Sequence, residues 1–308
     1  MSETAEIRHT LGESAARNLA NTTKTPAQWS GITPRWLVSF LEWVPLEAGM
    51  YQVNRVKEKS GDSEAVEASP RGDAELPETY VDYEQNPQEL WLNAITTVLD
   101  VQTRVSDLYS KPMDQIQEQL RLLIEKVKER QEDELVNNVD YGLLQIAAKS
   151  QRIKTRKGPP TPDDLDELIA KVWKQPSFFL ANPRTVAAIG RELTRRGVPP
   201  PTANLFGTPF LTWRGIPIVP SDKVRVDDKN RSQVLLVRTG EKKQGVVGLF
   251  QPGLPGEVSP SLSVRFMGIN HMAIASYLIS LYCSSAVLID DALGVLDDVD
   301  VGYYHDYK

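Results

Sequence analysis

The sequence has very few of the residues on which catalysis and metal binding depend. Its 308 residues include one cysteine, Cys283, and three histidines that lie far apart, His9, His271 and His305. A single cysteine excludes an internal disulfide and is typical of a reducing compartment. Because Cys283 lies in an apolar run, we expect a buried structural thiol. No histidine has a cysteine or a second histidine at the spacing of a metal site.

Motifs of common enzyme classes are absent as well. The sequence contains no Gly-x-Ser-x-Gly, and no GxGxxG follows an expected strand. Gly240 and Gly245 have the spacing that begins a phosphate-binding loop, but Val246 and Val247 replace its lysine and its serine or threonine. This pattern predicts a hairpin turn. We therefore predict that the chain is not an enzyme and has no catalytic, cofactor-binding or metal-binding residues.

The charge balance argues against a nucleic-acid-binding protein. The chain has 41 acidic and 35 basic residues, a net charge of −6 and a pI near 5.3. Nucleic-acid binding usually shows as a basic patch or domain. Residues 1–6 are acidic and lack the apolar core of a secretory signal. We expect a cytoplasmic protein with no nucleic-acid partner.

One uncharged run allows two interpretations. Residues 272–289 contain no charged side chain, and their length is near the lower limit for a membrane-spanning helix. Serines and tyrosines interrupt the run. Ile279, Leu281 and Cys283 occupy every second position, with Ser280 and Tyr282 between them, which predicts a long strand buried mainly on one face. We favour the strand and expect no membrane partner. A membrane-associated protein is the alternative.

The first fifty residues combine a polar arm with an apolar patch. Residues 1–33 are polar with a weak helical stripe, whereas residues 32–51 are rich in bulky apolar side chains, among them Trp36, Phe40 and Trp43. Such a patch belongs either to the chain's own core or to a surface that a neighbouring subunit buries. Trp36, Phe40 and Trp43 are therefore candidates for contacts between subunits.

The next segment predicts a long hairpin. Residues 54–88 are charged and contain few apolar side chains, but residues 50–53 and 79–83 have the character of short strands. These strands are the two expected arms of the hairpin. Because it has no core of its own, such a hairpin needs a partner to lie on.

The centre of the chain predicts a strand and two helices. Residues 94–105 are rich in β-branched side chains and favour a strand, although a helix face also fits. Pro112 begins an amphipathic helix that runs to about Asn137. It contains like-charge pairs such as Glu125–Glu129, so burial of its apolar stripe must stabilise it. A second helix begins at Thr161. Its expected buried residues are Leu165, Leu168, Ile169, Val172 and Trp173.

Residues 176–222 have the most informative order of elements. Asn182 and Pro183 have the cap and first-position residues of a helix. A proline-rich loop over residues 197–209 follows, and then a pair of short apolar strands. This order resembles the A-domain of Hong Kong 97-type phage major capsid proteins and of the encapsulin shell proteins.

Over nearly the whole chain, the order of elements resembles the family two encapsulins, in the A-type branch that lacks an inserted cyclic-nucleotide-binding domain. Residues 21–25, 32–37 and 43–49 are the most family-like segments. The resemblance implies an α+β Hong Kong 97 phage major capsid protein-like fold, in which residues 112–137 are the spine helix. The implied division is 1–48 extended N-terminal arm, 49–88 E-loop, 89–175 and 262–289 P-domain, and 176–261 and 290–308 A-domain and C-terminal tail.

The resemblance also implies a structural role. About sixty copies would close into an icosahedral nanocompartment that encloses an enzyme. In this branch the cargo is typically a cysteine desulfurase held through a disordered N-terminal segment, with a role in sulfur metabolism. Its pyridoxal phosphate belongs to the cargo and not to this chain. A phage or prophage major capsid protein that packages DNA is the alternative.

The same resemblance predicts a pore. In capsids of this fold, the loop after the A-domain helix meets its copies at the fivefold axis, and here that loop is residues 197–209. Proline restricts φ, which favours a rigid rim, and the uncharged lining favours selection by size. A loop that only connects two elements is the other interpretation. The candidate pore-lining residues are Pro199, Pro200, Pro201, Thr202, Asn204 and Phe206.

Overall fold

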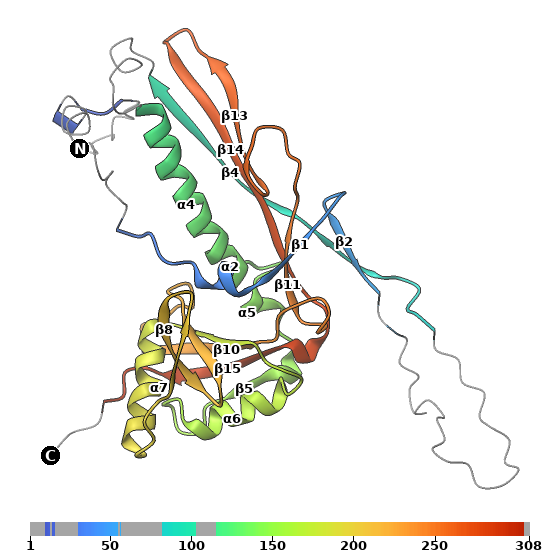
Figure 1. The fold of residues 1–308 in the computed structure, drawn as a ribbon, viewed down its shortest axis with the longest axis vertical. Helices are drawn as coiled ribbons and strands as arrows, with labels where there is room; N and C mark the ends of the chain where they lie inside the picture. The colour runs from blue at the N-terminus through green and yellow to red at the C-terminus, as the bar shows by residue number, and fades with distance from the viewer. Residues whose placement is uncertain are drawn as a thin grey trace, which may run out of the picture.

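The computed structural model describes residues 10–12, 14–15, 30–54, 56, 82–102 and 115–304. They form an elongated sheet with one long helix beside it and, below these in Figure 1, a smaller sheet covered by helices. A segment that contains the short helix α2 (Trp36–Phe40) and strand β1 (Glu42–Pro45) passes the meeting point of the two units. The fold is therefore a mixed α+β fold, as expected.

Strand β14 (Ile274–Val287) organises the elongated sheet. It pairs with β4 along one edge and with β13 and then β11 along the other. β1 joins by pairing in parallel with β11, and β12 pairs with β13. The further strands are β4 (Asn93–Gln102), β11 (Val246–Phe250), β12 (Glu257–Ser259) and β13 (Leu262–Ile269).

Two expectations about this sheet are confirmed and one is wrong. The predicted strand over residues 94–105 is β4, with residues 103–105 outside the described part. The uncharged run 272–289 is β14, so its interpretation as a membrane-spanning helix is wrong. Its backbone groups bond to strands on both sides instead of to one another. Among the described helices, none has the length and apolarity needed to cross a membrane.

Helix α4 (Gln115–Asn137) lies along the elongated sheet and reaches the smaller one (Figure 1). Its apolar stripe packs on β4, β13 and β14, where Val127 joins Leu262, Ile279 and Leu281 in one buried cluster. This confirms the amphipathic helix predicted from Pro112, whose first three residues lie outside the described part. Burial of the stripe therefore stabilises a helix with like-charge pairs on its surface.

The smaller sheet has the strand order β5-β15-β10-β6-β9-β8-β7. The 3₁₀ turn η1 (Lys149–Gln151) and α5 (Leu143–Ile146) connect it to α4, and η2 (Asp290–Ala292) precedes β15. Its strands are β5 (Arg152–Lys154), β6 (Phe178–Ala181), β7 (Thr202–Leu205), β8 (Thr208–Trp213), β9 (Ile216–Pro220), β10 (Arg231–Val237) and β15 (Leu293–Asp300).

Both faces of this sheet are buried, as alternate residues of β6 show. Phe178 and Leu180 pack in the cluster that contains Leu135 of α4 and Leu37 of α2. Phe179 and Ala181 pack on the opposite face, under α6 (Pro162–Lys171) and α7 (Pro183–Arg195). A strand with two buried faces reads as a continuous apolar run, which is what this segment shows.

The two helices over the smaller sheet begin at the predicted caps. Thr161 and Asp164 form a capping box at α6, and Asn182 caps α7 through Arg184 N at 2.9 Å. The prediction that Trp173 is buried is wrong, because its side chain is 69% exposed. α6 ends at Lys171, so Trp173 has already left the helical periodicity that buries Leu168.

The proline-rich segment after α7 is only partly a loop. Residues 202–205 form the edge strand β7, which pairs with β8 across a turn at Phe206 and Gly207. Residues 198–201 have no regular structure. The expectation of a continuous loop over residues 197–209 is therefore wrong for its second half.

The segments that form each of the two sheets do not coincide with the predicted domains. Residues 246–259 carry β11 and β12, which pair within the elongated sheet, whereas residues 152–171 carry β5 and α6 of the smaller unit. The domain boundaries predicted from the resemblance stay a prediction about the assembled protein.

The predicted long hairpin has a described base. β2 (Met50–Val53) pairs antiparallel with β3 (Gln88–Trp91), and an isolated bridge joins Val56 to Tyr83. Residues 57–81 lie outside the described part. The expected second arm at 79–83 is described only at residues 82 and 83, so β3 is the arm that pairs with β2.

Close packing joins β1 to β11. Trp43 lies opposite Gly248 in the parallel register, and its indole Nε1 donates to Val38 O at 2.9 Å. A Cβ on Gly248 would lie 2.6 Å from the Trp43 ring, well inside van der Waals contact. Only glycine therefore allows the indole to lie against β11.

Gly248→Ala should displace the Trp43 indole from β11. We expect a destabilisation of about 1–3 kcal/mol, as for overpacking in other cores, seen as a lower midpoint of thermal unfolding. Gly31→Ala is the matched control, because a Cβ there has no heavy atom within 4 Å. Equal midpoints for Gly248→Ala and the control would show that Trp43 is not held in this position.

Candidate functional site

The described residues contain no cluster that could perform catalysis by a thiol or a metal. Burial raises the pKa of the Cys283 thiol to about 12, so this cysteine stays protonated and unreactive. No group of three or more His, Cys, Asp or Glu side chains in the described part lies close enough to hold a metal ion. The candidate functional features are therefore surfaces and junctions.

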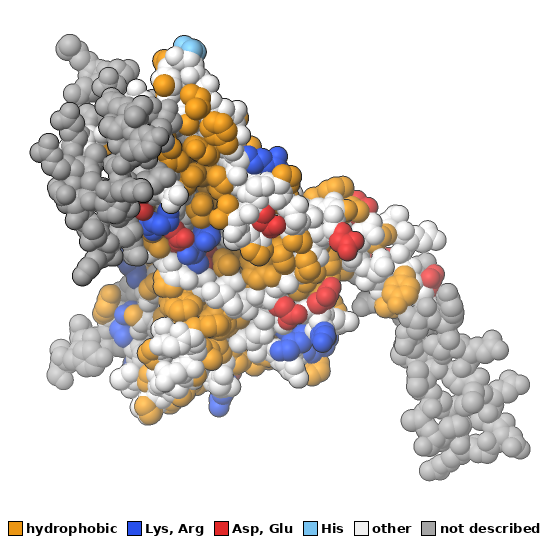
Figure 2. Space-filling view, turned by 45° about the horizontal axis from the view of Figure 1, so that its top comes forward, with side chains coloured by type: hydrophobic (Ala, Val, Ile, Leu, Met, Phe, Trp, Pro, Cys, Tyr) orange, Lys and Arg blue, Asp and Glu red, His pale blue; other side chains and the backbone are white. Residues whose placement is uncertain are grey.

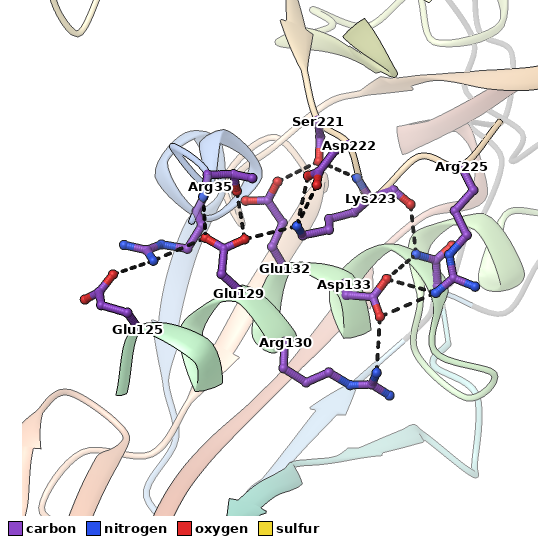
Figure 3. A network of polar contacts seen from close by, with 12 residues as sticks. Arg35, Glu125, Glu129, Arg130, Glu132, Asp133, Ser221, Asp222, Lys223 and Arg225 are labelled. Carbon is purple, nitrogen blue, oxygen red and sulfur yellow. Dashed lines mark hydrogen bonds and ion pairs between the residues drawn. The ribbon is translucent and has the colours of Figure 1, made fainter. Parts of the chain in front are cut away.

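A network of polar contacts joins α4 to two distant segments (Figure 3). The first is the amino-terminal segment before α2. Thr33 donates to Glu129 from its backbone N at 2.8 Å and from its hydroxyl at 2.9 Å. Arg35 forms ion pairs with Glu125 at 2.6 Å and with Glu129 at 3.4 Å. Arg35 therefore bridges the like-charge pair on the helix and removes its repulsion.

The second segment follows β9 in the smaller unit. Lys223 Nζ contacts Glu129 at 3.0 Å and Asp222 at 2.9 Å, and its side chain is 13% exposed. Burial lowers the pKa of Lys223, but its bonds to Asp222 and Glu129 outweigh burial and raise it, so the ammonium stays charged. Glu129 thus receives contacts from both segments on one carboxylate (Figure 3).

The last turn of α4 extends the same junction. Asp133 pairs with Arg225 at 3.1 Å and with Arg130 at 3.4 Å. Asn137 donates to Asp133 at 2.8 Å and to the backbone oxygen of Lys223 at 2.9 Å. These contacts bind residues 221–225 to the end of the helix. They fix how the smaller unit meets the elongated one.

Glu132 is the buried member of this junction. Glu132 is 1% exposed, and its Oε1 accepts a hydrogen bond from the Ser221 hydroxyl at 2.6 Å. Among the described residues, Oε2 has no hydrogen-bond partner. The pKa of Glu132 is raised to about 7. Burial is the largest cause and Glu129 and Asp222 add to it, whereas Ser221 and Lys223 act in the opposite direction. A carboxyl with one unpartnered buried oxygen is most stable in its neutral form.

A groove lies beside this junction, with a volume of about 500 Å³. Its walls come from the segment before and within α2, from α4, and from strands of the elongated sheet. Arg35 and Lys128 are the charged side chains in the lining. The apolar lining residues are Pro34, Val38, Trp43, Phe250, Pro260, Leu262 and Leu281.

Exposed apolar side chains gather at the end of the elongated sheet. Phe266, Met267, Ile269 and Met272 are each between 57% and 61% exposed. They lie on β13 and on the turn to β14, and hydrophobic side chains are visible along this part of the molecule in Figure 2. A patch of this kind is typical of a protein–protein interface.

The predicted inter-subunit residues pack within their own chain. Trp36 lies 5.1 Å from Phe210 between ring centroids, and Phe40 lies 5.1 Å from Phe178. Trp43 packs on Phe250 at 6.5 Å. All three side chains border the main buried cluster and are half-buried. The core interpretation therefore holds for these contacts, and an additional contact with a neighbouring subunit stays a prediction.

The candidate pore residues lie in three different environments. Pro199, Pro200 and Pro201 precede β7, and Thr202 and Asn204 lie on its exposed side. Phe206 lies at the hairpin turn, with its ring 5.1 Å from Phe40 and 6.2 Å from Trp36. Phe206 thus supports α2 within the same subunit. Their place in a pore stays a prediction.

Sequence reasoning did not find the junction, although one signal was present. Glu125 and Glu129 form a like-charge pair on α4, and the structure shows that Arg35 and Lys223 neutralise it. A repulsive pair of carboxylates in a long helix therefore indicated that basic side chains from other segments would contact it. Nothing in the sequence showed which of the 35 basic residues would provide them.

Comparison with known proteins places this architecture in a family. A family model described as "Type 2A encapsulin shell protein SrpI-like" matches residues 50–303. The chain belongs to the type 2A encapsulin shell proteins. This is a family of structural shell proteins that form capsid-like compartments and large homo-oligomers, and not of enzymes.

Individual relatives match almost the full length of this encapsulin. The type 2A encapsulin shell protein SrpI of Synechococcus elongatus is 61% identical over 298 residues, which are 97% of this chain and 96% of the relative. The type 2A encapsulin shell protein of Mycolicibacterium paratuberculosis is also 61% identical over 298 residues, 97% of each chain. The structure resembles the electron cryomicroscopy structure of the holo-SrpI encapsulin complex of Synechococcus elongatus, with a TM-score of 0.84, 58% identity and coverage of 97% and 99%.

More distant solved structures show the fold alone. A Microbacterium phage Oxtober96 structure has a TM-score of 0.60 at 10% identity, covering 90% of this chain and 94% of its own. A virus-like particle from Pyrococcus furiosus has a TM-score of 0.52 at 13% identity, covering 92% and 96%. The Hong Kong 97-like capsid fold is confirmed, and α4 is its spine helix. The family match decides against the phage capsid alternative.

Glu132→Gln should change how stability depends on pH. The folded pKa of about 7 lies above the ordinary value of 4.5, so the stabilisation from a neutral Glu132 is complete below about pH 4.5 and is lost as the pH rises through 7. The glutamine variant keeps a neutral side chain. We expect the free energy of unfolding of Glu132→Gln to exceed that of the wild type by an amount that grows across this window to about 2–3 kcal/mol.

The measurement is the midpoint of chemical unfolding from pH 5 to pH 8, which lies in the window set by the pKa of Glu132. Asp140→Asn, at an exposed site just after α4, is the control for loss of one negative charge. If the unfolding midpoints of Glu132→Gln and the wild type differ by the same amount at every pH in this range, the assigned pKa is contradicted.

Proposed function

We propose that about sixty copies of this encapsulin close into an icosahedral shell around an enzyme, a cysteine desulfurase, and that the loaded shell acts in sulfur metabolism in the cytoplasm. The observation that carries this proposal is the match, over 97% of the chain, to a relative solved as a holo encapsulin complex. A similarity of this extent supports the same mode of assembly. The desulfurase follows from the resemblance to the A-type branch.

The groove beside α2 is the described surface best suited to hold a cargo segment. Its apolar lining includes Val38, Phe250 and Leu281, and its volume of about 500 Å³ accommodates several side chains. We assign to it the N-terminal segment of the cargo enzyme, with apolar side chains on the floor and acidic groups toward Lys128.

The amino-terminal arm and the pore belong to the same proposal. We infer that residues 1–33 clasp a neighbouring copy, while Thr33 and Arg35 anchor the start of the described segment on α4. Residues 199–201 are the part of the predicted pore rim that neither pairs in a strand nor packs on α2. We expect them to be nearest to an opening.

Co-expression with the cysteine desulfurase of the same host tests the cargo and the groove together. We expect wild-type shells to carry the desulfurase through size-exclusion chromatography. Val38→Asp should lower loading by at least about tenfold, because it places a carboxylate against the apolar floor. Val258→Asp is the control, on an exposed side chain (63%) outside the groove.

Electron microscopy of each variant shows whether shells still form, which separates loss of cargo from loss of assembly. Wild-type shells that never carry the desulfurase would contradict the proposed cargo. Loading of assembled Val38→Asp shells at the wild-type level would contradict the groove assignment and leave the cargo proposal standing.

A further inference from the structure

A basic hollow on the smaller unit shares no lining residue with the groove or with the junction at Glu129. It has a volume of about 560 Å³ and lies between the end of α7, the loop before α6 and the residues after β15. These three segments are far apart in the sequence. The lining residues are Lys157, Pro159, Thr161, Glu192, Arg195, Arg196 and Tyr303.

Two cations of this hollow have no acidic partner among the described residues. Arg196 pairs with Asp163 at 3.3 Å, whereas Lys157 and Arg195 form no ion pair in this part of the chain. The one carboxylate in the lining belongs to Glu192, which is 4% exposed. The hollow therefore has an excess of positive charge in a chain whose net charge is −6.

The walls of the hollow are held in place by their own contacts. Gly158 O accepts a hydrogen bond from Asp300 N at 2.7 Å, which fixes the loop that carries Lys157. Arg191 donates to Val301 O at 3.0 Å and lies over the Tyr304 ring at 4.3 Å, which fixes the segment that carries Tyr303. The cations are thus presented by ordered segments, so a ligand would find the site already formed.

We propose that this hollow binds a phosphate group, either as free phosphate or as a small phosphate ester. Arg195 offers a planar fork of N–H donors and Lys157 a point charge, which together suit a dianionic oxygen cluster. The volume of about 560 Å³ leaves room for a phosphate group together with the organic group of an ester. Residues 197–201 directly follow Arg195 and Arg196, so the bound anion lies beside the proposed pore rim and offsets part of the positive charge there.

Isothermal titration of assembled shells with inorganic phosphate, at constant ionic strength against chloride, tests the proposal. We expect saturable binding at one site per subunit. Lys157→Gln combined with Arg195→Gln should weaken it by at least about tenfold. Lys242→Gln combined with Lys243→Gln is the control, because it removes two exposed charges from the turn before β11.

Three results would overturn the site. These are the absence of saturable binding, an equal loss of affinity in the control variant, and an electron cryomicroscopy map in which a carboxylate of a neighbouring subunit fills the hollow. Repeating the titration with glycerol 3-phosphate distinguishes the two sources. Tighter binding of the ester supports an ester ligand, and tighter binding of inorganic phosphate supports the free ion.

Discussion

The carboxylate of Glu129 accepts two hydrogen bonds from Thr33 and forms ion pairs with Arg35 and Lys223. These partners come from the amino-terminal segment and from the loop after β9, so one side chain of the spine helix connects two distant parts of the chain. Around it, α4 buries one apolar stripe on the elongated sheet and its last turns on the smaller sheet. The relative placement of the two units depends on this helix. A shell subunit needs such a fixed placement, because a closed assembly repeats each angular error at every copy.

Much of the fold could be predicted because burial leaves a periodic pattern. The stripe of α4, the uncharged run of β14 and the helix caps at Thr161 and Asn182 were all visible in the sequence. Trp173 was misassigned because a side chain two residues beyond a helix end no longer follows the 3.6-residue period. β7 was missed because its alternation spans only four residues and directly follows three prolines, which favour a loop.

The functional features were harder to predict, since they depend on contacts between distant residues. The junction joins Arg35 to Glu125 across 90 positions, and the basic hollow joins Lys157 to Arg195 and Tyr303. No local pattern indicates such pairs. The capsid-like family, in contrast, was predictable from the order of elements over nearly the whole chain. The order of elements along the chain is enough to indicate the topology of the fold. A functional site can be identified only when the positions of its side chains in space are known.

The chain thus provides a rigid subunit whose chemistry lies in its surfaces: an apolar groove, a basic hollow and exposed apolar side chains at the end of the elongated sheet. Assembly of these subunits into one closed shell is tested most directly by native mass spectrometry of the purified particle. Sixty copies of the 34.4 kDa chain predict an empty-shell mass of about 2.1 MDa. A species of one or a few subunits, or a shell of a different copy number, would contradict this assembly.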